Sequence, residues 1–291
     1  MPRFTPVRED ATFVDAEGVT IHYYVWRAGA PKGVVQIVHG VGEYATRYEQ
    51  FAQELVAAGY TVYAGDLRGH GRTGVQQTDG DLSRLGRLGA GGVRAPIAGI
   101  RKLSAIARDE SPGLPLVLLG QSLGSLFAQR MINEDAAPYD AVVLLGTAYR
   151  TLLHMNGGDL AKRHREPGGT GTEWLSRDPE VWTRFADDPL TFDAKVMKLF
   201  GFVETTRLLG RPSRKINRDL PVLIVIGSED PLGGPKSVGL LARAYRRRAG
   251  LSDVTVEIYE GARHEMLNET NRDEVIADLV AWLDARVSTR A

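Results

Sequence analysis

Short apolar runs alternate with segments of helical spacing along most of the chain, and this alternation limits the possible folds more than any other feature. The apolar runs lie at residues 34–38, 61–64, 116–119, 141–145, 220–226 and 254–259. Helical spacing lies at residues 44–58, 93–108, 123–133, 236–248 and 272–287. Continuous apolar strands that alternate with amphipathic helices are typical of parallel sheets. The sequence therefore predicts an α/β fold, a mostly parallel sheet with helices on both faces.

Two stretches depart from this alternation. Residues 11–26 alternate around a turn at residues 15–18, which predicts a hairpin at an antiparallel edge. Residues 147–218 carry glycines, charge clusters and proline-containing turns but no clear strand. With 291 residues, of which 43% are hydrophobic, the chain suits one core built from residues 1–146 and 219–291. We expect residues 147–218 to be inserted after the sixth strand of that core as a cap, or lid.

The charge balance and the missing cysteines exclude several classes of function. Lys and Arg number 36 together, as do Asp and Glu, so no basic excess favours binding to nucleic acid. The absence of cysteine excludes disulfides, a thiol nucleophile and a thiolate metal site. Residues 1–15 lack the apolar stretch of a secretion signal, and the longest apolar runs fall far short of the roughly 20 residues that span a bilayer. We therefore expect a cytoplasmic protein.

A candidate nucleophile lies between an apolar strand and an apolar helix, in the sequence Gly120-Gln121-Ser122-Leu123-Gly124. A tight strand-to-helix turn needs small residues two positions to either side of the serine, and it raises the hydroxyl above the edge of the sheet. The pattern alone is weak, because an ordinary turn also contains glycine and serine. Its place between strand and helix favours a nucleophilic Ser122.

A serine nucleophile needs a base and a group that orients the base, and both candidates follow strands. His264 follows the run at residues 254–259, and Asp230 follows the run at residues 220–226. The order serine, acid, histidine is the order of this triad in α/β folds. Glu229 is a competing carboxylate, but Asp230 precedes a proline, which favours an extended backbone. A solvated loop pair or a helix cap remains the alternative for both acids.

Acyl transfer also needs two donors for the tetrahedral oxyanion, and backbone N–H groups meet that need. Leu123, directly after the serine, is expected to supply one. The second is expected from Val41, in the loop that follows the run at residues 34–38, where glycines let the backbone approach closely. For His39, in the same loop, we favour a purely structural role.

With these residues in place, the sequence resembles the monoacylglycerol lipase and lysophospholipase group of α/β-hydrolases, which includes proteins named serine aminopeptidases. The resemblance spans nearly the whole chain. It rests on His39-Gly40-Val41-Gly42-Glu43 with Arg47-Tyr48, on Asp66-Leu67-Arg68-Gly69-His70-Gly71, on the Ser122 turn, on Asp230-Pro231 and on His264-Glu265. It implies the α/β-hydrolase fold with a helical cap over an acyl pocket.

The same resemblance bears on the substrate. Residues 175–179 and 187–190 look like parts of the group's cap, which favours lipid esters. Glu43 and Arg47 would make the polar contacts to glycerol. Tyr44 and Leu267 stand where members of the group have histidines, and these departures bear on glycerol recognition rather than on hydrolysis.

The apolar residues at positions 195–203 fit three roles: packing of the cap against the core, which we favour, an acyl channel, or transient contact with a membrane or micelle. We expect a serine esterase that cleaves monoacylglycerols or related lipid esters through an acyl-enzyme, without metal or organic cofactor. The alternatives are a lactonase, amidase or peptidase with the same triad, or a binding protein without activity. The sequence leaves the oligomeric state open.

Overall fold

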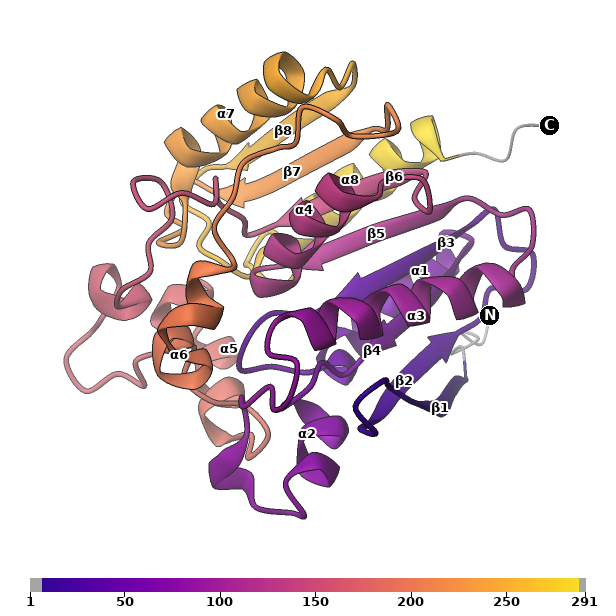
Figure 1. Cartoon of the computed structure of the whole chain (residues 1–291). Coiled ribbons are helices and arrows are strands. Elements are labelled where there is room, and N and C mark those ends of the chain that lie inside the picture. The colour runs from indigo at the N-terminus through magenta and orange to yellow at the C-terminus, as the bar shows by residue number, and fades with distance from the viewer. Residues whose placement is uncertain (1–6, 288–291) are drawn as a thin grey trace, which may run out of the picture.

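One eight-stranded sheet forms the centre of the computed structural model, which describes residues 7–287 (Figure 1). The strands are β1 (Arg8–Val14), β2 (Thr20–Trp26), β3 (Gly33–Val38), β4 (Tyr60–Gly65), β5 (Leu116–Gln121), β6 (Ala141–Leu145), β7 (Val222–Gly227) and β8 (Val254–Tyr259). Their order is β1-β2-β4-β3-β5-β6-β7-β8. Strands β1 and β2 form the expected antiparallel hairpin, whereas neighbours from β4 to β8 are parallel. The predicted α/β architecture is confirmed.

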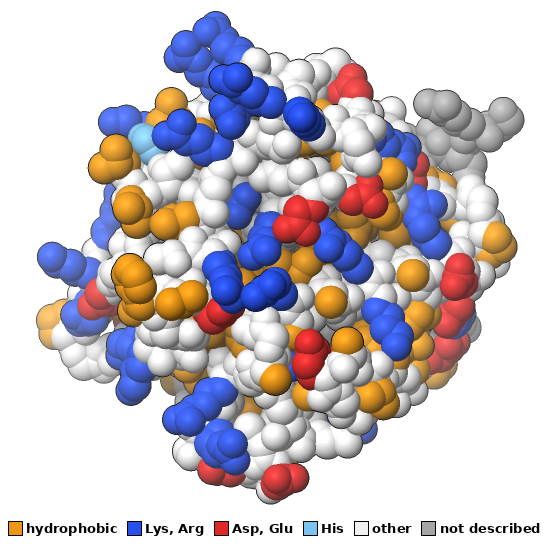
Figure 2. Space-filling model, in the orientation of Figure 1, with side chains coloured by type: hydrophobic (Ala, Val, Ile, Leu, Met, Phe, Trp, Pro, Cys, Tyr) orange, Lys and Arg blue, Asp and Glu red, His pale blue; other side chains and the backbone are white. Residues whose placement is uncertain are grey.

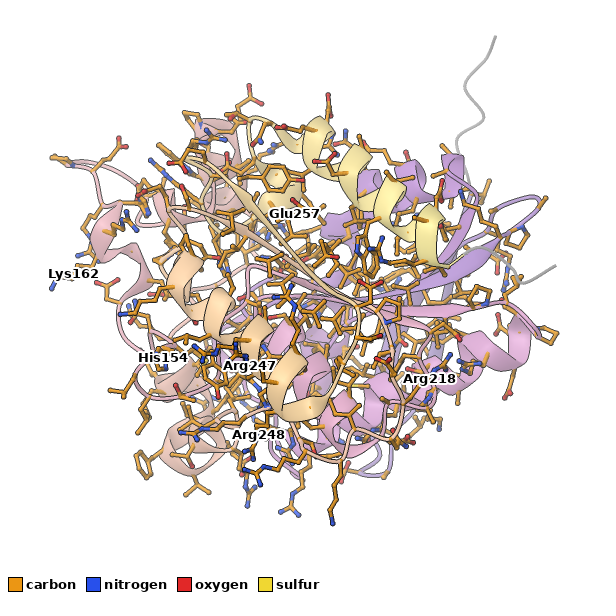
Figure 3. All side chains as sticks on the ribbon, turned by 90° about the horizontal axis from the view of Figure 1, so that it is seen from above. His154, Lys162, Arg218, Arg247, Arg248 and Glu257 are labelled. Atoms are coloured by element: carbon orange, nitrogen blue, oxygen red, sulfur yellow. The ribbon has the colours of Figure 1, made fainter. Side chains whose placement is uncertain are left out.

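Helices cover both faces of the sheet (Figure 3). One face carries α3 (Arg94–Glu110), α4 (Leu123–Glu134) and α7 (Gly234–Ala244), and the other carries α1 (Glu49–Ala57) and α8 (Arg272–Arg286). Each face buries its own apolar cluster. Phe127 and Met131 of α4 belong to the first cluster, and Leu279 and Leu283 of α8 belong to the second. Burial on both faces explains why the central strands are mostly apolar.

Some elements differ from those that periodicity predicts. The helix α2 (Gly71–Gln77) buries glycine and threonine instead of an apolar stripe, so its sequence carries no helical pattern. The segment expected as one helix at residues 44–58 begins as a 3-10 turn, Ala45–Tyr48, before α1 starts at Glu49. The last helix before β8 ends as a π-helix, Tyr245–Ala249.

The segment between β6 and β7 lies beyond the carboxyl ends of the parallel strands (Figure 1). It contains the 3-10 turns η3 (Leu160–Arg163) and η4 (Glu173–Leu175) and the helices α5 (Pro179–Asp187) and α6 (Val196–Thr206). A small apolar cluster of its own includes Trp174, Leu175 and Phe185. Helix α6 is interrupted at Gly201, whose φ of 78° suits glycine.

Packing against the core accounts for only part of the apolar surface of α6. Val196 and Phe200 pack against the core, as favoured from the sequence, but no residue of α6 is fully buried. Phe202 and Val203 are 70% and 60% exposed. Within residues 7–287, no helix is long and apolar enough to cross a membrane.

Candidate active site

Ser122 occupies a strained turn between β5 and α4. Its φ of 51° and ψ of −118° are unusual for a residue with a side chain. The turn is also crowded: a Cβ added to Gly120 would lie 2.5 Å from the backbone of Gly124, and one added to Gly124 would lie 2.1 Å from the carbonyl oxygen of Val38. Only glycine fits at these two positions. Strain of this kind often marks a functional site.

His264 and Asp230 meet at the same edge of the sheet, after β8 and β7. His264 Nδ1 lies 2.9 Å from Asp230 Oδ2, and both side chains are buried. Asp230 Oδ1 accepts a hydrogen bond of 2.8 Å from Leu232 N. Glu229 points away and pairs with Arg163, and its side chain is 37% exposed. The structure therefore brings Asp230, and not Glu229, to the histidine.

The surroundings of His264 favour its protonated form. Burial alone lowers the pKa of His264, but the charge of Asp230 and the hydrogen bond to it, with the charges of Glu265 and Glu43, raise that pKa above the ordinary histidine value. His264 Nε2 is buried and has no hydrogen-bond partner in the part of the chain that the structure describes. This nitrogen is therefore free to accept a proton.

A cavity of about 450 Å³ opens at Ser122. Val41 and Leu123 line it together with the serine, and within residues 7–287 no hydrogen bond from the N–H of either residue is recorded. The other lining side chains are mostly apolar and include Leu126, Val196, Met197, Leu208 and Leu232. Ser122, Val41 and Leu123 thus share one apolar cavity.

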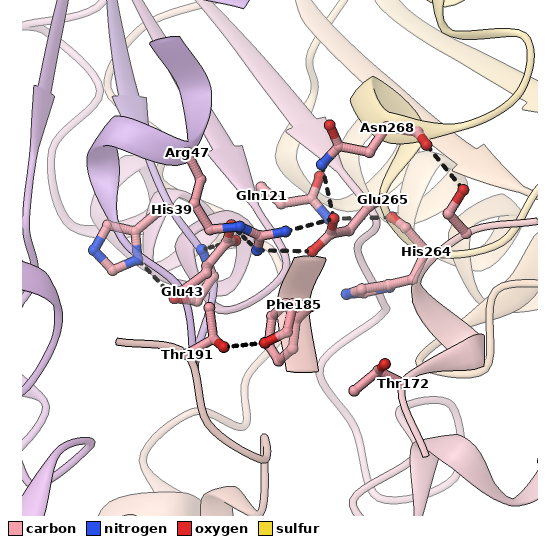
Figure 4. A network of polar contacts seen from close by, with 12 residues as sticks. His39, Glu43, Arg47, Gln121, Thr172, Phe185, Thr191, His264, Glu265 and Asn268 are labelled. Atoms are coloured by element: carbon pink, nitrogen blue, oxygen red, sulfur yellow. Dashed lines mark hydrogen bonds and ion pairs between the residues drawn. The ribbon is translucent and has the colours of Figure 1, made fainter. Parts of the chain in front are cut away.

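Glu43 and Arg47 lie in a second cavity, of about 270 Å³, that does not include Ser122. Glu43 Oε1 accepts hydrogen bonds from Gly40 N at 2.6 Å and from the Tyr48 hydroxyl at 2.9 Å. Arg47 bridges Glu43 at 3.2 Å and Glu265 at 3.3 Å (Figure 4). Burial raises the pKa of Glu43 to about 7. The two side chains hold the loop that follows β3 in place, and their contact with glycerol stays a prediction.

His39 also fixes this loop. Its Nδ1 lies 2.7 Å from the carbonyl oxygen of Gly40, and its Nε2 accepts a hydrogen bond of 2.9 Å from Leu67 N. Burial and the nearby His70 lower the pKa of His39 well below its ordinary value. A neutral, doubly bonded imidazole matches the structural role that we favoured from the sequence.

Three contacts of His264 are not foreseen from the sequence. The ring of Trp174 lies 4.8 Å from the imidazole, centroid to centroid. The carbonyl oxygen of Leu175 accepts a hydrogen bond of 3.1 Å from His264 N, and the side chain of Gln121 donates one of 3.1 Å to His264 O. Trp174 and Leu175 lie in an irregular segment without periodicity, so only the neighbouring cap-like sequence at residues 175–179 pointed to this region.

Known proteins match the chain over almost its whole length. Residues 29–271 match the family described as serine aminopeptidase, S33. A monoacylglycerol lipase of Mycolicibacterium smegmatis is 31% identical, over 95% of this chain and 97% of the lipase. A monoglyceride lipase of Homo sapiens is 26% identical, over 99% of this chain and 94% of its own.

Solved structures support the fold. A thermostable carboxyl esterase from Bacillus coagulans, crystallised with glycerol, matches with a TM-score of 0.85 at 23% identity, over 97% of this chain and 99% of the esterase. The mostly parallel sheet, the strained Ser122 turn and these full-length matches agree with one another. The chain belongs to the serine aminopeptidase S33 family of α/β-hydrolases, in the group that includes the monoacylglycerol lipases.

Proposed function

We propose that the protein hydrolyses carboxylic esters of lipids, with Ser122 as nucleophile, His264 as general base and Asp230 as the group that orients the base. The observation that carries this proposal is the buried His264–Asp230 pair, with a contact of 2.9 Å, together with a strained serine that lines an apolar cavity. Full-length similarity to monoacylglycerol lipases supports the ester substrate.

The geometry suits a two-step acyl transfer. His264 Nε2 removes the proton from Ser122 Oγ as the serine attacks the ester carbonyl, and the resulting imidazolium is stabilised by Asp230. The N–H groups of Val41 and Leu123 donate to the tetrahedral oxyanion. Collapse breaks the ester C–O bond, and His264 returns the proton to the leaving alcohol. Water, deprotonated by His264, then attacks the acyl-enzyme, releases the carboxylic acid and restores Ser122.

The cavity at Ser122 indicates the acyl side of the substrate. With about 450 Å³ and mostly apolar walls, it suits a medium or long acyl chain. We therefore expect monoacylglycerols or related esters as substrates, and the segment at residues 147–218 as the cap of the acyl pocket. Glu43 and Arg47, in the neighbouring cavity, are the expected contacts of the glycerol.

The cap also offers an apolar surface to a lipid aggregate. Phe202 and Val203 of α6 are exposed, and Leu152 and Leu153 near the start of the segment are 82% and 89% exposed. Figure 2 shows hydrophobic and basic side chains next to one another over this part of the molecule. Exposed apolar side chains close to a lipid pocket favour transient contact with a membrane or micelle.

A substrate panel tests the proposed function. Hydrolysis of monoacylglycerols and p-nitrophenyl esters from short to long acyl chains is measured for the wild type and for Ser122→Ala. We expect higher kcat/KM for longer acyl glycerides and no turnover by Ser122→Ala. Activity confined to short esters, lactones or amino-acid amides would keep the triad but reject the lipid substrate, whereas full activity of Ser122→Ala would reject the mechanism.

A further inference from the structure

We propose that Trp174, in the segment between β6 and β7, is a positioning residue for His264, an inference that rests on the proposed role of His264 as base. The indole and imidazole centroids lie 4.8 Å apart, with the ring planes inclined by 42°. Trp174 is 9% exposed and His264 is 2% exposed, so the contact is closed to solvent.

The ring contact adds a restraint that the bond to Asp230 does not supply. One hydrogen bond at Nδ1 fixes the tautomer of His264, but it restrains rotation of the ring about the Cβ–Cγ bond at one ring atom only. An aromatic face packed against the imidazole opposes this rotation. Nε2 is one of the two ring atoms farthest from Nδ1, so this rotation displaces it, and it is the atom that must reach Ser122.

Backbone hydrogen bonds fix Trp174 relative to the histidine. The carbonyl oxygen of Leu175 accepts from both His264 N, at 3.1 Å, and Glu265 N, at 2.7 Å. The guanidinium of Arg263 donates to the carbonyl oxygen of Glu173, at 2.6 Å, on the other side of the tryptophan. Trp174 is therefore held to the histidine loop by its two neighbours in sequence.

A buried carboxylate ties the same two segments together a second time. Glu269 accepts hydrogen bonds from Arg263 N at 2.6 Å and from Arg177 Nε at 2.8 Å, and Glu269 is 2% exposed. Hence the turn η4 and the residues that follow it move with the histidine loop. This part of the cap segment acts as a fixed support of the base, in contrast to the exposed helix α6.

Trp174 also separates His264 from open space. The tryptophan lines a cavity of about 390 Å³ within the cap segment, together with Phe185 and Phe192, and His264 is not among the residues that line it. Removal of the indole would leave the imidazole beside an enlarged cavity. Because a displacement of about 1 Å in a catalytic group costs roughly 10²-fold in rate, this freedom should reduce turnover.

The test uses p-nitrophenyl acetate, a substrate too small to depend on the acyl cavity, with enzyme concentrations set by active-site titration. We expect Trp174→Ala to lower kcat by roughly 10- to 100-fold, with KM changed by less than about twofold. Trp174→Phe keeps an aromatic face and should recover kcat to within about threefold of the wild type. If Trp174→Ala does not fold, Trp174→Leu replaces it, with the same expected loss.

Trp282 supplies the matched control. It is a tryptophan of α8 with similar burial, 7% exposed. Its indole N–H donates a hydrogen bond to the Thr255 hydroxyl and, in the part of the chain that the structure describes, makes no recorded contact with His264. Trp282→Ala should keep kcat per titrated site. The proposal fails if Trp174→Ala retains kcat, if only KM changes, if phenylalanine and alanine lose kcat equally, or if Trp282→Ala loses as much. Ser122→Ala, measured in parallel, separates this failure from that of the proposed function, because persistent turnover in that variant would reject the triad itself.

Discussion

At the scale of single residues, the site contains polar atoms without protein partners, although such buried atoms also occur elsewhere within residues 7–287. Most buried polar groups in proteins are hydrogen-bonded, so an exception needs a reason. Here His264 Nε2 lacks a partner, and within the described residues no hydrogen bond from the N–H of Val41 or Leu123 is recorded. We expect these three groups to make their hydrogen bonds when Ser122 reacts with the ester carbonyl. Interactions that are stronger in the transition state than in the ground state are the ones that accelerate a reaction.

The proposed orienting role of Asp230 predicts a large difference between two adjacent acids. Asp230→Asn keeps the shape of the side chain but removes the charge that stabilises the imidazolium, so kcat should fall by roughly 10⁴-fold. Glu229→Gln removes only a partly exposed ion pair with Arg163 and should stay within about threefold of the wild type. Steady-state kinetics on one ester give kcat for both variants. A larger loss of kcat in Glu229→Gln than in Asp230→Asn would show that Glu229, and not Asp230, orients the histidine.

The pH dependence of the base follows from the same pair. As the proposed base, His264 would act only when neutral, and Asp230 helps to raise its pKa, so the acidic limb of kcat/KM should lie above the ordinary histidine pKa. In Asp230→Asn the burial of the ring remains while the raising charge is lost. The residual activity should therefore persist to lower pH than in the wild type. A limb that stays in place, or moves to higher pH, would contradict this account of the pKa.

At the scale of elements, tight packing limits which residues the turn between β5 and α4 can contain. Gly124→Ala would bring its Cβ to 2.1 Å from Val38 O, and the resulting overpacking should lower the free energy of unfolding by about 1–3 kcal/mol. Gly99→Ala is the matched control, because it lies inside α3 with no heavy atom within 4 Å of an added Cβ. It should stabilise the protein by about 0.5–1 kcal/mol. Denaturant unfolding measures both, and equal effects would reject the steric argument.

Elements with a strong apolar period are the ones that the sequence predicts well. The strands from β3 to β7 and the helices α3, α4 and α8 follow from periodicity because each buries a continuous run or one stripe. Strand β8 is also expected from its sequence, although it leaves Glu257 and Ile258 exposed. The helix α2 does not, since its buried residues are Gly71, Thr73 and Gly74. The segment between β6 and β7 is held by backbone carbonyls and scattered ion pairs, which leave no period in the sequence.

The difference between regular elements and irregular segments also decides which parts of the site can be predicted from the sequence. Ser122, Asp230 and His264 could be placed because they follow strands of one parallel sheet, whose carboxyl ends meet at one edge. The contacts of Gln121, Trp174 and Leu175 with the histidine depend on how irregular chain packs around it. Glu43 and Arg47 lie in a cavity apart from Ser122, and their expected contact with glycerol stays a prediction.

The whole molecule combines balanced charge with a local apolar surface on the segment between β6 and β7. The net charge is zero, so contact with a neutral lipid surface would depend on apolar burial and not on attraction between opposite charges. Burial of a side chain of the size of valine or phenylalanine contributes roughly 1.5–3 kcal/mol. Phe202 and Val203 are therefore large enough to decide whether the protein stays on a vesicle.

A double variant tests this surface. Phe202→Ser with Val203→Ser should reduce co-sedimentation with phosphatidylcholine vesicles containing monooleoylglycerol by more than about tenfold, because the burial of both side chains is lost. Hydrolysis of soluble p-nitrophenyl butyrate should remain. Ile258→Ser, at a 46% exposed position on β8, is the control and should bind as the wild type does. Equal losses in both variants would show that this surface has no special role.

Covalent labelling can identify the nucleophile of this protein in one step. The wild type, Ser122→Ala and His264→Ala are incubated with a fluorophosphonate, and the modified peptide is located by mass spectrometry. We expect one adduct, on Ser122, that forms rapidly in the wild type, slowly in His264→Ala and not at all in Ser122→Ala. Ester hydrolysis that continues while Ser122 stays unlabelled, or a label on another residue with loss of activity, would contradict it.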